Sequence, residues 1–180
     1  MNVRSAKSAC MMVNEQCLLL WKRSFLAVAA VCAISTICCA PLHPSDQSLE
    51  QNLRNHRAEF ETLVRMLDED AEVVRIVDNR VYFREGYNRQ FPQERLKEYH
   101  HLFKKLGIAA GIHRNGDTVR LIASNKGLFV PSSEKSYVYI RRTPSPLVES
   151  LDRVINSDQG DQTPVYKKVF DNWYIYYESW

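Results

Sequence analysis

Cysteine is missing from most of this sequence. All five cysteines lie within the first 39 residues, and none follows Cys39. Their absence from residues 40–180 excludes a disulfide framework, thiolate catalysis and a cysteine-ligated zinc site in that part of the chain. Any role for cysteine is therefore confined to the N-terminal leader.

Charge is also missing from one long stretch. The run from Phe25 to Ala40 has no charged residue, and Lys22 and Arg23 directly precede it. A basic start, an apolar run and small residues are typical of a secretory signal, while an apolar stretch of about 18 residues can also span a bilayer. The pattern therefore predicts export. It leaves open a lipoprotein signal, an uncleaved N-terminal membrane anchor, a cleaved secretory signal and, against the pattern, a cytoplasmic chain.

The end of the apolar run predicts a lipid anchor. Bacterial lipoprotein signals end in a short apolar or small tripeptide followed by the cysteine that receives the diacylglycerol, and Cys39 stands at such a position. Cys38 is the weaker candidate, because it would place the branched Ile37 where a small residue is needed. Thr36 and Cys38 depart from the usual tripeptide. The alternative is that both cysteines are small apolar residues of a membrane segment.

Surplus positive charge is confined to the leader. We expect the leader to comprise residues 1–39, with translation starting at Met1, Met11 or Met12, and a single exported domain to comprise residues 40–180. The whole chain has a net charge of +3, but the domain has equal numbers of basic and acidic residues. Nucleic-acid binding depends on neutralising phosphates, and a balanced domain argues against it. The same balance makes the domain a weak electrostatic partner for anionic lipid.

The spacing of apolar and turn residues predicts an α+β domain. The predicted helices cover residues 45–67, 92–107 and 146–155. The predicted strands form hairpins over residues 72–85 and 164–180, with further strands, including GLFV at 127–130, between residues 108 and 141. The expected architecture is an N-terminal helix and further helices packed on an antiparallel sheet, with a C-terminal β-hairpin.

Several segments of the domain resemble a group of uncharacterised bacterial lipoproteins of similar length. The segments are LHPSDQSLEQNLRNHRAEFETLVRML, ERLKEYHHLFKKLGI, ASNKGL, PSPLVESLD and NWYIYYES. In that group a cysteine precedes a Pro-Ser-Asp opening, and the chain ends in an aromatic Asn-Trp-Tyr strand. The resemblance covers most of residues 41–178. It implies a lipoprotein leader and implies nothing about mechanism.

No motif predicts catalysis or a metal site. His100 and His101 are adjacent on a predicted helix and point about 100° apart, so a three-histidine zinc site would also need His113. The sequence has no HExxH or GxSxG motif, and a pairing of Ser124 with His113 is conjecture. We therefore expect no enzyme, no cofactor and no metal. The alternative is a small envelope hydrolase or metalloenzyme that uses these histidines.

Tyrosines on the predicted strands form the candidate binding face. Strand alternation places Tyr137 and Tyr139 on one face with Arg141, and it places Tyr174 and Tyr176 together on the last strand. Aromatic rows beside an arginine suit recognition of a protein or a sugar. The alternative is that the tyrosines form cross-strand pairs that stabilise the sheet.

Together these patterns predict a bacterial cell-envelope lipoprotein that is anchored through Cys39 and faces the periplasm. Its expected work is non-catalytic binding or scaffolding. The expected partners are the membrane, through the lipid or a single-pass inner-membrane helix, and a protein or glycan of the envelope. A periplasmic inhibitor or immunity-type protein is a third possibility that the sequence leaves open.

Overall fold

The computed structural model describes residues 43–87, 89–127, 132–157 and 164–180. By internal contacts the chain divides into Met1–Pro41 and Leu42–Trp180. The predicted lipidation site at Cys39 or Cys38 lies outside the described residues, as does most of the strand predicted at 127–130. Among the described residues, no helix combines the length and the apolar character that crossing a membrane would require.

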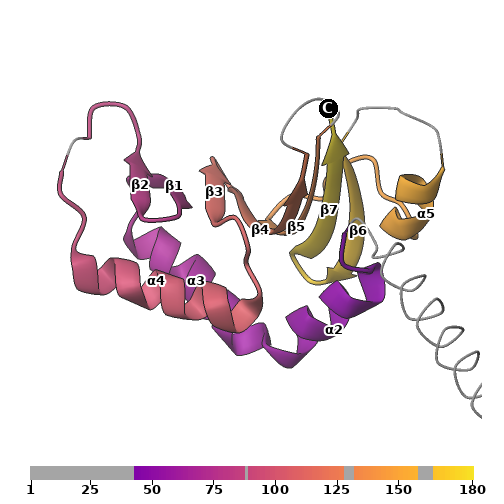
Figure 1. Ribbon diagram of the computed structural model, residues 1–180, viewed down its shortest axis with the longest axis horizontal. Helices are drawn as coiled ribbons and strands as arrows, with labels where there is room; N and C mark the ends of the chain where they lie inside the picture. The colour runs from indigo at the N-terminus through magenta and orange to yellow at the C-terminus, as the bar shows by residue number, and fades with distance from the viewer. Residues whose placement is uncertain (1–42, 88, 128–131, 158–163) are drawn as a thin grey trace, which may run out of the picture. The chain divides into compact units, whose positions relative to one another are not determined.

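The first helical segment consists of two helices where the sequence predicted one. Helix α2 spans Asp46–Asn55 and helix α3 spans Arg57–Glu69, and the backbone turns between them at His56 with φ −117° and ψ 28°. The apolar residues leave a gap between Leu53 and Phe60, which both lie in the core. A change of direction within that gap disturbs no buried side chain. Figure 1 shows the bend between α2 and α3.

Seven antiparallel strands form one sheet, in the order β2-β1-β3-β4-β5-β7-β6. The strands are β1 (Val73–Val77), β2 (Arg80–Phe83), β3 (Ile112–Asn115), β4 (Thr118–Lys126), β5 (Ser133–Ile140), β6 (Val165–Phe170) and β7 (Trp173–Ser179). Consecutive strands pair in both predicted hairpins, β1–β2 and β6–β7. The predicted α+β class, with helices on an antiparallel sheet and a C-terminal hairpin, is confirmed.

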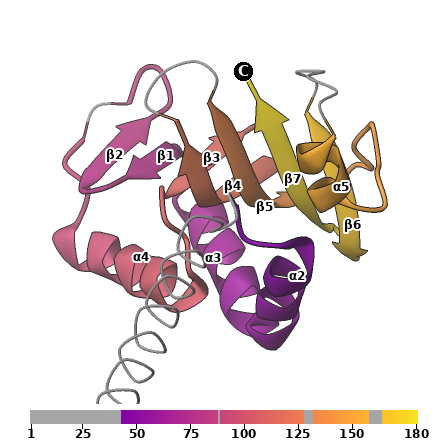
Figure 2. The ribbon, with the colours of Figure 1, turned by 45° about the vertical axis from the view of Figure 1, so that its right-hand side comes forward.

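Helix α4 follows the predicted boundaries closely. It spans Gln93–Leu106 after Pro92, and it ends at Gly107 with φ 68°, a left-handed conformation that glycine adopts without steric cost. Its buried residues are Leu96, Tyr99, Phe103 and Leu106. Figures 1 and 2 show α4 on the same side of the sheet as α2 and α3.

Helix α5 is shorter than predicted. It spans Leu151–Asn156, and the expected start at Ser145 or Pro146 is wrong. The preceding residues run beside β6 instead, because the N–H of Tyr166 donates to Pro146 O at 3.1 Å and the N–H of Val148 donates to Tyr166 O at 2.8 Å. Leu147, within the predicted helix, is exposed. Backbone pairing with the sheet edge therefore replaces the first turn of the predicted helix.

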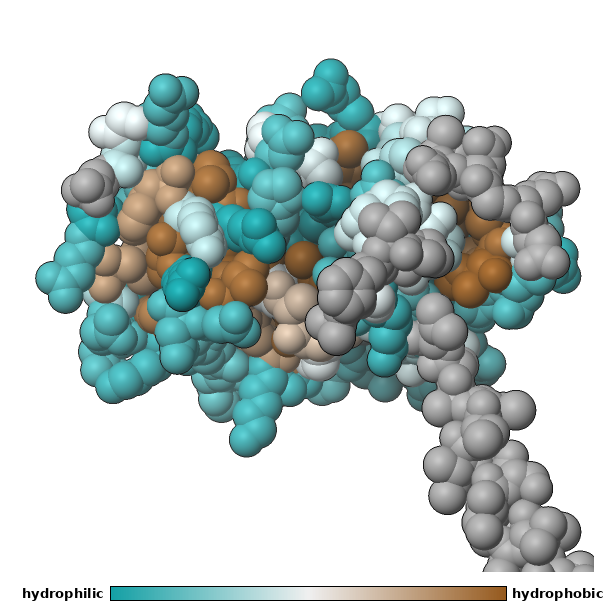
Figure 3. Space-filling model, turned by 45° about the horizontal axis from the view of Figure 1, so that its top comes forward, coloured by the Kyte–Doolittle hydropathy of each residue, from teal (hydrophilic) through white to brown (hydrophobic). Residues whose placement is uncertain are grey.

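The hydrophobic core lies between the sheet and helices α2, α3 and α4. Phe60 of α3 is fully buried, and its ring lies edge-on against Tyr137 of β5 and Trp173 of β7, at centroid distances of 4.7 and 5.5 Å. On the face drawn in Figure 3, apolar side chains gather inside a hydrophilic outline. The contacts of Phe60 thus hold β5 and β7 against α3.

Candidate functional site

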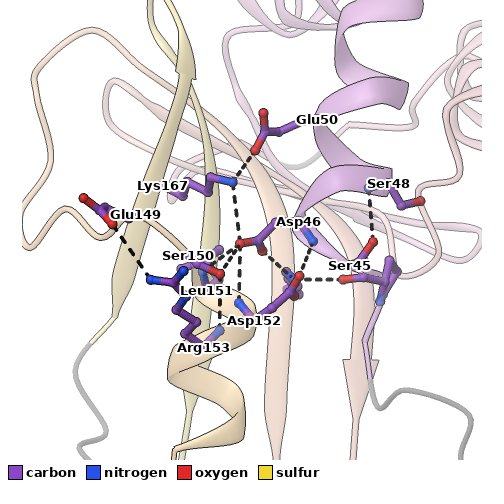
Figure 4. Close-up of polar contacts among 12 residues, drawn as sticks. Ser45, Asp46, Ser48, Glu50, Glu149, Ser150, Leu151, Asp152, Arg153 and Lys167 are labelled. Carbon is purple, nitrogen blue, oxygen red and sulfur yellow. Dashed lines mark hydrogen bonds and ion pairs between the residues drawn. The ribbon is translucent and has the colours of Figure 1, made fainter.

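A polar network lies where the described chain begins and α2 starts. Asp46, the first residue of α2, is only 4 % exposed and points at the start of α5 (Figure 4). Its Oδ2 atom accepts from the N–H of Leu151 at 2.8 Å and from the Ser150 hydroxyl at 3.2 Å. In return, the N–H of Asp46 donates to Asp152 Oδ2 at 2.9 Å. Two helix starts that are 105 residues apart in sequence therefore cap each other.

Lys135 of β5 occupies the centre of this network. Its side chain is 0 % exposed, and its Nζ atom lies 2.6 Å from Asp152 Oδ1, 2.8 Å from Pro44 O and 2.8 Å from Asp46 Oδ1. An ammonium group has three N–H bonds, and Asp152 Oδ1 and Pro44 O each accept one of them. The contact with Asp46 Oδ1 is at ion-pair distance but lacks hydrogen-bond geometry, and this oxygen has no other partner among the described residues.

The charges of the network shift two pKa values in directions that keep both groups ionised. Burial alone would raise the pKa of Asp46, but Lys135 and the N–H groups of Asp152 and Leu151 outweigh it, and the pKa lies below its ordinary value. Burial would likewise lower the pKa of Lys167 on β6, but Glu50 and Asp46 raise it. The carboxylates of Asp46, Asp152 and Glu50 thus face the ammonium groups of Lys135 and Lys167. The network therefore has more carboxylates than ammonium groups, which leaves an excess of hydrogen-bond acceptors.

His43 holds the residues just before α2 against the sheet. Its Nδ1 atom lies 2.7 Å from the Ser124 hydroxyl of β4, and its Nε2 atom lies 2.8 Å from the Ser133 hydroxyl of β5. Burial, together with the charges of Lys135 and Lys126, lowers the pKa of His43 to about 4. The ring is therefore neutral at pH 7, with one nitrogen donating and the other accepting. Both ring nitrogens of His43 and both serine hydroxyl groups therefore have a hydrogen-bond partner.

A groove opens beside the network, between α2, the start of α5 and β6. Its volume is about 580 Å³. The lining residues are Asp46, Gln47, Glu50, Gln51, Arg54, Asn55, Ser150, Asp152 and Lys167. A second hollow of about 400 Å³ shares Gln47, Gln51 and Asn55 with the first and adds Ser45, Ser48 and Asn52.

The shared carboxamides follow one line on the exposed side of α2. Gln47, Gln51 and Asn55 are spaced four residues apart, so they project from neighbouring turns. Each carboxamide offers both a donor and an acceptor, and none carries charge. We call Gln47, Gln51 and Asn55 the carboxamide row. The row and the acceptors beside it can bind a ligand that is rich in hydroxyl or amide groups.

The structure does not bring the five predicted face residues together. Tyr137 is 1 % exposed and lies in the core, where its hydroxyl accepts from Asn52 Nδ2 at 2.8 Å. Tyr139 contacts Trp173 on the same side of the sheet, at a ring-centroid distance of 5.2 Å. The remaining two tyrosines, Tyr174 and Tyr176, are buried on the opposite side.

The fifth predicted face residue lies outside β5. Arg141 follows the end of the strand and is exposed, with its guanidinium 3.6 Å from Asp68. The aromatic rows therefore pair within the sheet: Tyr176 lies 5.2 Å from Tyr166 on the neighbouring strand, and Trp173 lies beside Tyr139. This arrangement matches the cross-strand alternative for the tyrosines.

The three histidines of the catalytic alternative are engaged separately. His100 on α4 lies 2.6 Å from Asp78 O, and His113 on β3 lies 2.9 Å from Arg120 Nη2. His101 is exposed on α4. In the part of the chain that the structure describes, no three histidine, cysteine or acidic side chains are grouped to hold a metal. Ser124, considered only beside His113, contacts His43 instead.

Sequence reasoning passed over Lys135, His43 and Asp46. One signal was present for Lys135, because alternation along SEKSYVYI places it on the same strand face as Tyr137, which is a core position. No local signal marks its partners Asp46 and Asp152, which reach it from distant parts of the chain. Comparison of the chain with protein-family models, curated proteins and solved structures finds no match.

Proposed function

We propose that the protein is a membrane-attached, non-catalytic binding protein of the bacterial cell envelope. In this proposal the leader holds the chain at the membrane through Cys39, and the groove beside the carboxamide row binds a hydroxyl- and amide-rich partner such as a cell-wall glycan. The observation that carries the proposal is the position of the groove, which opens directly beside the residues that follow the leader.

The fixed start of the domain supports attachment close to the membrane. His43 and Asp46 are buried, and Pro44 O accepts from Lys135. Only three residues, 40–42, stand between the predicted anchor at Cys39 and His43, the first described residue. An anchored domain of this kind has little freedom to move away from the bilayer.

The chemistry of the groove supports a glycan. Its lining has three carboxylates, those of Asp46, Glu50 and Asp152, against two basic side chains, so it favours ligands that donate hydrogen bonds, and hydroxyl groups do so without charge. The carboxamides of Gln47, Gln51 and Asn55 are exposed and able to meet both hydroxyl and acetamido groups. A charged polymer would instead meet carboxylates and ammonium groups that are already paired.

Attachment is tested by expressing the full chain and Cys39→Ser in a bacterium. We expect the native chain to be processed, to incorporate radiolabelled palmitate and to partition into detergent, and we expect Cys39→Ser to do none of these. Cys38→Ser is the matched control and should leave lipid incorporation intact. Equal partitioning of the two chains with the whole leader retained would show a plain membrane anchor in place of a lipid.

Glycan binding is tested by sedimenting the detergent-solubilised full chain with purified peptidoglycan sacculi. We expect the native chain to sediment, and we expect Gln51→Ala and Asn55→Ala to lower the bound fraction. Gln93→Ala removes an equally exposed carboxamide at the start of α4, away from the groove, and should have no effect. Failure of the native chain to sediment would reject a cell-wall glycan as the ligand.

A further inference from the structure

One end of the sheet gathers the residues nearest the leader. At this end β4 finishes, β5 begins and β7 finishes, and the hydroxyl of Ser133 at the start of β5 contacts His43. The neighbouring residue, Ser132, exchanges two backbone hydrogen bonds with Trp180, of 2.8 and 2.9 Å. Trp180 therefore pairs with the residue next to Ser133, which contacts His43, the first described residue.

Trp180 is unlike the other tryptophan that the structure describes. Trp173 is buried in the core, whereas Trp180 is 42 % exposed at the tip of β7 (the end marked C in Figure 1). Lys126, at the end of β4, is also exposed at this end of the sheet. We call Lys126, Ser132 and Trp180 the tip of the sheet. An exposed tryptophan and an exposed lysine at the same end of a sheet are the composition that favours a membrane–water interface.

The covalent chain limits how far the tip of the sheet can lie from the predicted anchor. Four peptide units connect Cys39 to His43, and a fully extended chain of four residues spans at most about 14 Å. His43 is buried and bound to two strands, so the domain cannot gain reach by unwinding its first residues without breaking those contacts. The tip is thus held near the bilayer whenever the leader is.

We propose that the tip of the sheet lies against the lipid headgroups, with the Trp180 indole in the interfacial region of the bilayer. The inference rests on the proposed membrane attachment, and it adds a surface that orients the domain. Alternation along β7 places Trp180 on the opposite sheet face from Ser179. In this proposal the ends of the strands contact the bilayer, and neither face of the sheet does.

The short connection to the predicted anchor and the exposed indole of Trp180 point to a bilayer as the occupant of this surface. The domain has no net charge, so general electrostatic attraction to anionic lipid is weak and the contact depends on the tether and on the indole. Two of the other exposed aromatic side chains, Tyr82 and Tyr87, lie on or after the edge strand β2, at the far side of the sheet order from β7. They have no comparable link to the residues that follow the leader.

Bromolipid quenching of tryptophan fluorescence tests the contact. The full chain with Trp21→Phe, which removes the leader tryptophan, is reconstituted into phosphatidylcholine vesicles with and without bromine on the acyl chains near the headgroups. We expect bromolipid to quench this chain, and we expect Trp180→Phe in the same background to remove most of the quenching. The remaining tryptophan, Trp173, is buried and reports that the domain is folded.

Tyr82→Trp in the background that lacks Trp21 and Trp180 is the matched control. It places an exposed indole on β2, and we expect bromolipid to leave it unquenched while aqueous iodide quenches it. Flotation of the vesicles separates the two proposals. A chain that does not float with the vesicles rejects membrane attachment itself. A floating chain whose Trp180 is quenched by iodide and not by bromolipid overturns this inference alone, as does equal bromolipid quenching of the indole at position 82.

Discussion

The Nζ atom of Lys135 lies 2.6 Å from Asp152 Oδ1, and the lysine side chain has no exposed surface. A buried ammonium group is costly unless acceptors surround it closely. Here one carboxylate from α5, one from α2 and one backbone carbonyl share it. The lysine thereby connects the sheet to both helix starts. Its loss would remove the ion pair of Asp152 and leave Asp46 with the more distant Lys167, at 3.7 Å.

Lys135→Met is expected to lower the free energy of unfolding by about 3 to 5 kcal/mol, the usual cost of removing one partner from a buried ion pair. Methionine fills a similar volume but donates no hydrogen bond to Asp152 Oδ1 or Pro44 O and carries no charge. Chemical denaturation of the full chain, followed by circular dichroism, measures the change. Lys168→Met is the matched control on β6, where the side chain is exposed, and it should change stability by less than about 0.5 kcal/mol.

A second substitution separates charge from packing. Asp46→Asn keeps an oxygen that can accept from the N–H of Leu151 but removes the carboxylate charge. On the Lys135→Met background it should recover part of the lost stability, whereas on the native background it should be destabilising. Simple additivity of the two changes would show that Asp46 and Lys135 do not interact energetically.

His43 is expected to make the domain acid-sensitive. Its pKa in the folded protein is about 4, below its ordinary value of 6.5, so the unfolded chain binds the proton more readily. The stability contribution is therefore complete above pH 6.5 and is lost as the pH falls toward 4, at up to about 1.4 kcal/mol per pH unit. Denaturation midpoints measured across this range should fall steadily.

His43→Gln removes this titration while keeping a side chain that can donate and accept. Its stability curve should be flatter than that of the native chain between pH 6.5 and 4, although its stability at pH 7 is lower. His113→Gln is the comparison, because burial and Arg120 also lower the pKa of His113. Asp46 acts in a separate window, since its pKa is lowered from 3.8 and its contribution is lost only at more acidic pH. Parallel curves for His43→Gln and the native chain would exclude His43 as a source of acid sensitivity.

The sequence predicted those parts of the fold that depend on local patterns. Helix α4 is delimited by Pro92 and Gly107, and both hairpins turn at Asp-Asn pairs, so periodicity and turn residues located them. The break at His56 was missed because the residues around it are compatible with a continuous helix. The first turn of the third predicted helix was wrong, because Pro146 and Val148 pair with Tyr166 of the later strand β6.

Local sequence patterns could not predict the candidate site, because its contacts join residues that are distant in the sequence. Asp46 and Ser45 read as an ordinary helix start, and Lys135 reads as one polar residue at the beginning of a strand. Their connection depends on α5, which brings Asp152 to both. For the predicted tyrosines, alternation identifies which residues share a face of the sheet, but it does not tell whether the core or solvent covers that face.

Arg120 is expected to stabilise two glutamates that stand opposite each other on neighbouring strands. Glu134 of β5 pairs in register with Glu178 of β7, and the Arg120 Nη1 atom lies 3.7 Å from a carboxylate oxygen of each. Like charges opposite one another destabilise a sheet. Arg120→Met should therefore lower the free energy of unfolding by about 1 to 3 kcal/mol, and Glu178→Gln on that background should recover part of it. Arg153→Met, at an exposed ion pair on α5, is the control with little expected effect.

Gly111 is expected to be the glycine least tolerant of alanine. Its φ is +83°, and a Cβ atom built on it would lie 1.9 Å from the backbone oxygen of Ile76. Gly116 also has a positive φ, of +56°, but a Cβ there meets no atom within 4 Å. Gly116→Ala should therefore cost only the conformational strain, about 1 to 2 kcal/mol, while Gly111→Ala must also push β1 away from β3. Thermal unfolding of the two variants measures the difference, and equal losses would show that the approach of Gly111 to Ile76 does not constrain the sheet.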